Sequence, residues 1–174
     1  MPIDPCAECG FDPADLRPGD MATAVRSFGR RYRAPLTRGL PGEDLDAIVR
    51  ASPGPGVWSA LQYAEHVVDI FTVFDDRVRR ALDGREPDEP VVDWEGKVAA
   101  APDRDRIEVV DELTDRADDL GTMLAELNAD EWNLRTLTGR GREVPVVDVA
   151  GIVVHEGSHH LLDIGRVLRA ARGR

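Results

Sequence analysis

The sequence predicts an all-α protein that folds as a four-helix bundle. Four long segments carry apolar residues at steps of three and four, the intervening loops are polar and rich in proline and glycine, and no segment forms a convincing sheet. At 174 residues the chain is long enough for one domain with a sizeable core. We expect an extended N-terminal arm over residues 1–19, which hold four prolines, and the bundle over residues 20–174.

Apolar periodicity and end signals mark the first three helices. They are expected over residues 20–38, 59–82 and 104–127. Ser59 followed by Gln62 is typical of a capping box, which stabilises the start of the second helix. A short amphipathic piece is predicted at 43–49. Residues 84–102 show no sustained period and are expected to form a long connection.

The fourth helix is predicted from about residue 146 or 148 to 170. Its first nine residues, VVDVAGIVV, are rich in β-branched side chains and also suit a strand. Helix is favoured because Leu161 and Leu168 continue the same helical register. Gly157 costs the helix roughly 1 kcal/mol relative to alanine, so an interior glycine there indicates close packing against a neighbour. The preceding loop, 131–145, leaves room for a short strand pair.

Composition excludes several classes of partner. The net charge of −11 argues against nucleic acid or an anionic membrane, because both require clustered positive charge. No stretch reaches the roughly 20 apolar residues of a membrane helix, and the N-terminus lacks the features of a secretory signal, so we expect a cytoplasmic protein. Lys97 is the one lysine among 22 basic residues, which is typical of a high-GC bacterial genome.

Cys6 and Cys9 form a C-x-x-C pair in the arm. In a cytosolic protein such a pair indicates metal or redox chemistry more than a structural disulfide. A zinc ribbon requires a second such pair, and a thioredoxin-like site requires a strand–helix context that Pro5 and Pro13 do not supply. We therefore expect the pair to lie on a surface arm without a catalytic role, with metal or redox chemistry as the alternative.

Three of the four histidines suggest a metal site. His155 and His159 lie one turn apart on one face of the fourth helix, and His66 lies on the apolar face of the second. Facing helices of a bundle commonly supply such ligands together. We predict a divalent-metal site at His66, His155 and His159, with an open position as in catalytic zinc sites. The alternative is a metal-free bundle with hydrogen-bonded core histidines.

Zinc is the favoured metal, and nickel, iron and manganese also suit imidazole ligands. Asp69, three residues after His66, and Asp163, four after His159, are predicted to accept hydrogen bonds from the ligating imidazoles. His160 lies about 100° around the helix from His159. We therefore expect it to support the ligands, to contact the substrate or to lie at an interface, and not to share the coordination.

Other side chains are candidates for substrate chemistry. Glu156 is the candidate catalytic acid or base. The alternative is a carboxylate that is solvated or forms an ion pair between helices. Arg135 and Arg142, with Arg140 between them, are candidates for binding an anionic substrate. The alternative is that these side chains are simply exposed to solvent. Trp58 is expected to pack at the start of the second helix.

The segment from His155 to His159 also matches H-E-x-x-H, the motif of zinc proteases. The third ligand of those proteases lies downstream, whereas only 15 residues follow His159 here. The third ligand must therefore come from upstream, and a metallohydrolase of that type is a remote alternative.

Two segments, WSALQYAEHVVD around His66 and HEGSHHLLDI from His155, resemble the DinB-like, YfiT-type metalloenzyme superfamily. The N-terminal CAECGFD is similar to an arm of actinobacterial members. The resemblance covers the chain after about residue 20. It implies a four-helix bundle whose metal is bound by one histidine of the second helix and an H-x-x-x-H pair of the last helix, here His66, His155 and His159.

The resemblance also implies an activity. The superfamily includes S-transferases that use bacillithiol or mycothiol, and mycothiol-dependent maleylpyruvate isomerases. We therefore expect a metal-dependent transferase that joins a small thiol to an electrophile, and the high-GC composition favours mycothiol. A non-catalytic metal-binding or stress-response module is the alternative. The oligomeric state stays open, with a homodimer as one expectation.

Overall fold

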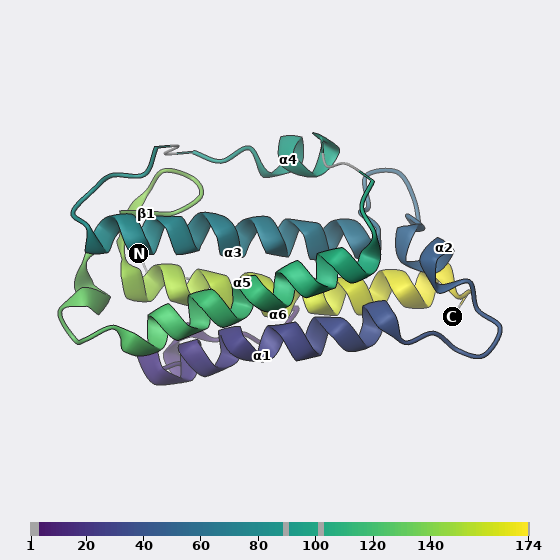
Figure 1. Ribbon diagram of the computed structural model, residues 1–174, viewed down its shortest axis with the longest axis horizontal. Coiled ribbons are helices and arrows are strands. Elements are labelled where there is room, and N and C mark those ends of the chain that lie inside the picture. Colours follow the sequence, from purple (N-terminus) through teal and green to yellow (C-terminus); the bar gives the residue numbers. More distant parts are fainter. Residues whose placement is uncertain (1–3, 89–90, 101–102, 174) are drawn as a thin grey trace.

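The computed structural model describes residues 4–88, 91–100 and 103–173. Four long helices form the bundle (Figure 1): α1 (Pro18–Thr37), α3 (Ala60–Leu82), α5 (Arg106–Glu126) and α6 (Val146–Ala171). The predicted all-α four-helix bundle is therefore confirmed. Helix α6 is regular from its first residue, so the helical interpretation of VVDVAGIVV is confirmed as well. The capping box at Ser59 and Gln62 is present at the start of α3.

The helices pack in an order that differs from their order in the chain. Helix α1 packs against α5 and α6, and α3 also packs against α5 and α6, so α1 and α3 occupy diagonal corners. Long connections make this arrangement accessible. The first contains the short helix α2 (Leu45–Arg50), and the second contains α4 (Trp94–Ala100). Helix α6 is consequently flanked by α1 and α3.

Two small elements lie beside α3 (Figure 1). Helix α4 lies in the connection that the sequence predicts to be irregular. The sequence does not predict this helix because its seven residues are too few to show a helical period. Strands β1 (Arg135–Leu137) and β2 (Glu143–Pro145) form the short antiparallel pair for which the sequence left room. Arg77, buried on α3, donates a hydrogen bond to the carbonyl of Leu137 at 2.8 Å and fixes this hairpin to the bundle.

A close contact sets the position of α6 against α1. Tyr32 of α1 donates a hydrogen bond to the carbonyl oxygen of Gly157 at 2.8 Å. A Cβ atom on Gly157 would lie 2.6 Å from the Phe28 ring, a distance that real Cβ contacts do not reach. The close packing predicted from the interior glycine is therefore present.

The N-terminal arm folds against the bundle. The amide of Cys6 donates to the carbonyl of Phe11 at 2.8 Å, and the amide of Gly10 donates to the carbonyl of Cys6 at 2.9 Å. A single 3-10 turn, Pro13–Asp15, follows. Phe11 is only 8% exposed, so the arm is anchored and is not simply extended over its described part. Residues 1–3 of the predicted arm lie outside the described residues.

Across the described ranges, no helix combines the length and the apolar character that crossing a membrane requires.

Candidate metal centre

Helix α6 contributes to two groups of potential metal ligands. Within the described residues, these are the groups of three or more histidine, cysteine or acidic side chains whose ligand atoms all lie within 4.8 Å of one another. We call them the α3–α6 cluster and the arm cluster. The α3–α6 cluster consists of His66, Glu156 and His160, and the arm cluster consists of Cys6, Cys9, His155 and His159.

The structure divides the predicted ligands His66, His155 and His159 between the two clusters. The physical reason is helical phase, because successive residues of a helix are turned by about 100°. His155 and His159 face the N-terminal arm. Their sequence neighbours Glu156 and His160 have the same spacing of four and face α3. Two pairs with a spacing of four therefore overlap on α6, and the pair that lies beside His66 begins one residue after His155.

The α3–α6 cluster has the dimensions of a metal site. The Nε2 atom of His160 lies 3.1 Å from Oε2 of Glu156, and the rings of His66 and His160 have centroids 4.9 Å apart. Nitrogen and oxygen ligands of tetrahedral zinc lie about 3.4 Å apart, given bonds near 2.0–2.1 Å. The Nδ1 atom of His66 is buried without a hydrogen-bond partner, which costs about 1–3 kcal/mol unless a ligand satisfies it. These residues therefore fit a divalent metal.

The cluster offers a cation one neutral imidazole and one ionised carboxylate. Burial lowers the pKa of His66 to about 4, so its imidazole is neutral and has a free lone pair. Burial alone would lower the pKa of His160, but hydrogen bonds with Asp163 and Glu156 raise this pKa to about 9, so a metal ion that binds Nε2 must displace a proton from this ring. Burial would raise the pKa of Glu156, yet His155 and His160 hold that pKa well below the usual carboxyl range. Two imidazoles and a carboxylate form a donor set typical of zinc and related metals.

One of the two predicted supporting carboxylates contacts the histidines. Oδ2 of Asp163 lies 3.1 Å from Nδ1 of His160 and 3.5 Å from Nε2 of His159. Asp69 has no corresponding contact with His66, whose Nδ1 stays without a partner. Trp58 packs its ring 5.0 Å from the His66 ring, between centroids, in agreement with the expected packing position.

The α3–α6 cluster lies at a cavity of about 470 Å³, a size typical of small-molecule sites. His66 and Glu156 form part of its wall. The apolar side chains of the wall are Ile70, Phe74, Trp94 and Ile152. The other residues of the wall are Asp4, Thr138, Gly139, Arg140 and Arg142. Candidate metal ligands, apolar surface and positive charge therefore meet in one space.

The predicted substrate arginines separate in the structure. Arg140 and Arg142 are exposed and line the mouth of the cavity. Arg135 is exposed and pairs with Glu143 across the hairpin at 2.7 Å, and it is not part of the cavity wall. The side chain of Arg135 follows the strand pairing, whereas Arg140 and Arg142 lie in the turn that reaches toward α4.

Trp94 and Thr138 line the cavity although neither was a predicted site residue. Trp94 packs over Gly139, where a Cβ atom would lie 2.9 Å from the indole. The amide of Val92 donates to the carbonyl of Gly139 at 2.9 Å and joins the two segments. The contact between Trp94 and Gly139 joins segments that are distant in the sequence, so no local sequence pattern predicts it.

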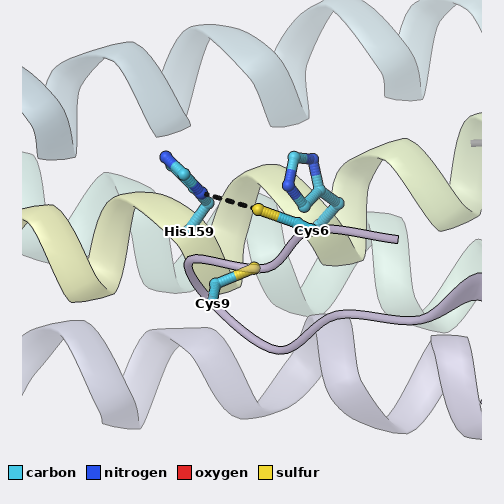
Figure 2. Close-up of side chains that lie close together, drawn as sticks. Cys6, Cys9 and His159 are labelled. Carbon is cyan, nitrogen blue, oxygen red and sulfur yellow. Dashed lines mark hydrogen bonds between the residues drawn. The ribbon is translucent and has the colours of Figure 1, made fainter. Parts of the chain in front are cut away.

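The arm cluster places the C-x-x-C pair against α6. Sγ of Cys6 lies 3.5 Å from Nδ1 of His159, and Figure 2 shows the loop with Cys6 and Cys9 passing over α6 at this point. The backbone amide of Cys9, together with His155, lowers the pKa of Cys6 to about 6. Burial raises the pKa of Cys9. The half-buried pair thus lies on the arm and meets two histidines of α6.

Known families and structures show similarity over most of the chain. Residues 27–164 match the family model of the DinB superfamily. YfiT from Bacillus subtilis, described as a probable metal-dependent hydrolase with an unusual four-helix bundle topology, superposes with a TM-score of 0.70 at 12% identity, covering 97% of this chain and 91% of that chain. No curated protein matches the sequence significantly.

A mycothiol-dependent maleylpyruvate isomerase superposes with a TM-score of 0.71 at 20% identity. The similarity covers 89% of this chain and 63% of the isomerase, so the chain spans less than two thirds of the isomerase's length. At such identities the two structures establish the shared fold.

Proposed function

The chain belongs to the DinB superfamily, and from this premise we propose that it is a divalent-metal-dependent enzyme that acts with a low-molecular-weight thiol on a small electrophile. His66, Glu156 and His160 would hold the metal, with zinc as the favoured ion. The observation that carries the proposal is the unpartnered Nδ1 of His66 in a cluster that borders a cavity of about 470 Å³.

The donor set suits catalysis because three protein ligands leave a position for an exchangeable group. A bound zinc ion would depress the pKa of a thiol or polarise a carbonyl group. Asp163 orients His160 through the 3.1 Å contact with Nδ1. Trp94 and Phe74 form an apolar wall that limits access of water to the reacting groups.

Glu156 is better suited to holding the metal than to moving protons. Both of its oxygens are engaged, Oε1 at 3.4 Å from Nδ1 of His155 and Oε2 at 3.1 Å from Nε2 of His160. We therefore assign Glu156 a ligand role in place of the acid or base role expected from its sequence position. Arg140 and Arg142 would orient an anionic group of the substrate at the cavity wall.

The choice of mycothiol rests on two supports. A structurally similar protein is described as mycothiol-dependent, and the lysine-poor composition is typical of high-GC bacteria. Hydrolysis is the second candidate. It is favoured by the similarity to YfiT, which extends over nearly the whole of both chains.

The proposal is tested by following thiol loss with mycothiol and a generic electrophile, before and after removal of metal by a chelator. We expect metal-dependent consumption of the thiol that disappears in His66→Ala and His160→Ala. Arg135→Ala is the matched surface control, because its side chain pairs with Glu143 outside the cavity. Absence of turnover with every low-molecular-weight thiol would overturn the transferase assignment. Metal-dependent cleavage of a model ester without a thiol would support the hydrolase instead.

A further inference from the structure

A second metal site is formed where the N-terminal arm meets α6. We propose that Cys6, Cys9, His155 and His159 bind a structural zinc ion, separate from the metal of the α3–α6 cluster. Two thiolates and two imidazoles complete a tetrahedral zinc site without an open position, which is the arrangement of structural and not catalytic zinc. Sulfur ligands also favour zinc over magnesium, calcium or manganese.

The distances between the donor atoms agree with this coordination. All four donors lie within 4.8 Å of one another. In a tetrahedral site, zinc bonds near 2.3 Å to sulfur and near 2.0 Å to nitrogen separate the ligands by about 3.3–3.8 Å. The distance of 3.5 Å between Sγ of Cys6 and Nδ1 of His159 already falls in that range. Small side-chain rotations would bring the remaining donors to the same separation.

The two imidazoles are oriented as metal ligands. Nε2 of His155 is buried without a hydrogen-bond partner, while its Nδ1 lies 3.4 Å from Oε1 of Glu156. In His159 the Nδ1 atom faces Cys6, while Nε2 lies 3.5 Å from Oδ2 of Asp163. Each ring thus directs one nitrogen into the cluster and the other toward a carboxylate. Metal-bound histidines characteristically have a carboxylate or carbonyl on the second nitrogen.

The arm presents its sulfurs on a closed turn. The amide of Gly10 donates to the carbonyl of Cys6 at 2.9 Å, and the amide of Cys6 donates to the carbonyl of Phe11 at 2.8 Å. Gly10 has φ +74°, a conformation that a side chain disfavours. This turn brings Cys9 beside Cys6 without help from regular secondary structure, as Figure 2 shows.

The zinc ion would attach the arm to the bundle next to the proposed active site. Phe11 packs on His155 with ring centroids 5.2 Å apart, and Asp4 lines the cavity at the α3–α6 cluster. Glu156 and Asp163 each contact two histidines, one from the arm cluster and one from the α3–α6 cluster. The structural zinc would therefore hold in place the cavity wall, the proposed ligand Glu156 and the supporting carboxylate of Asp163.

The test uses the full chain loaded with zinc, with metal content measured per chain. We expect two zinc ions in the wild type and one in Cys6→Ser/Cys9→Ser, in His155→Ala/His159→Ala and in His66→Ala/His160→Ala. Glu8→Gln is the matched control, because Glu8 lies in the same loop and pairs with Arg166 at 2.9 Å without joining the cluster. This variant should keep both ions. Because each cluster has its own variants, failure of one assignment leaves the other testable.

Cobalt substitution adds a readout that already tests the proposal in the wild type, before any variant is compared with it. The wild type should show sulfur-to-cobalt charge-transfer absorption, which Cys6→Ser/Cys9→Ser abolishes and His66→Ala/His160→Ala retains. Amide hydrogen exchange in residues 4–16 should accelerate when zinc is removed. Absence of the sulfur absorption in the wild type would overturn the proposal. Cysteines that react only after a reductant, and not after chelation, would also overturn it, because they would form a disulfide.

Discussion

The two clusters on α6 are built from adjacent residues, yet they differ in ligand type and in enclosure. The α3–α6 cluster has two imidazoles and one carboxylate and borders a cavity. The arm cluster has two sulfurs and two imidazoles and is formed between a loop and the helix. A shift of one residue, which is about 100° of rotation, separates a site suited to reaction from a site suited to cross-linking the fold.

The neighbouring histidines His159 and His160 give the sharpest test of this difference. His160→Ala should lower the thiol-dependent kcat/KM by more than about 100-fold, because loss of a ligand exceeds the 10–100-fold effect of an outer contact. His159→Ala should lower it less, because that side chain belongs to the arm cluster. Steady-state kinetics, with metal content measured in parallel, compares kcat/KM in the two variants. A larger loss in His159→Ala than in His160→Ala would contradict the division.

Asp163 is the point where the clusters meet, and its removal should weaken both. Asp163→Asn is expected to lower metal affinity by about 10–100-fold, because His160 and His159 both lose a carboxylate on the second nitrogen. Competition with a chromogenic chelator measures the affinity. Asp69→Asn is the matched control, since Asp69 belongs to neither cluster and Nδ1 of His66 has no hydrogen-bond partner. An equal loss of metal affinity in Asp69→Asn would mean that Asp163 does not support the ligating histidines.

The rotation of α6 decides which face each residue presents, and Gly157 holds that rotation. Gly157→Ala should lower the free energy of unfolding by about 1–3 kcal/mol, because the new methyl group overlaps the Phe28 ring. Gly165→Ala on the same helix is the control. Its Cβ would meet only the end of the Arg169 side chain at 3.6 Å. The free energy of unfolding of the control should rise by up to about 1 kcal/mol. Denaturant unfolding measures both variants, and equal free energies would contradict the close contact between Gly157 and Phe28.

The smallest effect is expected at the cavity wall. Arg142→Ala should raise the KM for an anionic electrophile roughly fivefold, because a contact made by an exposed charge contributes at most about 1 kcal/mol. Arg135→Ala should leave KM unchanged, because Arg135 pairs with Glu143 outside the cavity. Initial-rate measurements over a range of substrate concentrations distinguish the two. Equal KM values in both variants would mean that Arg142 does not contact the substrate.

The fold was largely predictable because its signals are local. Apolar periodicity identified the long helices, and Ser59 with Gln62 marked where α3 begins. The interior Gly157 indicated the close contact with α1. Helix α4 was missed because seven residues lack a period, and the diagonal order of the helices depends on contacts between segments that are distant in the sequence.

The sequence identified the two helices that carry the candidate site, but not which of their side chains lie together. Histidine spacing correctly drew attention to α3 and α6. Two pairs with a spacing of four overlap on α6, however, and the choice between them depends on the rotation of the helix. Cys6 and Cys9 could not be assigned because nothing local shows that the arm returns to α6. The contact between Cys6 and His159 joins residues separated by 153 positions.

Anomalous diffraction from zinc-loaded crystals tests the two-site account most directly. We predict two peaks, one between His66, Glu156 and His160 and one among the side chains of the arm cluster. A single peak shared by His66, His155 and His159 would contradict the account and restore the ligand set expected from the sequence.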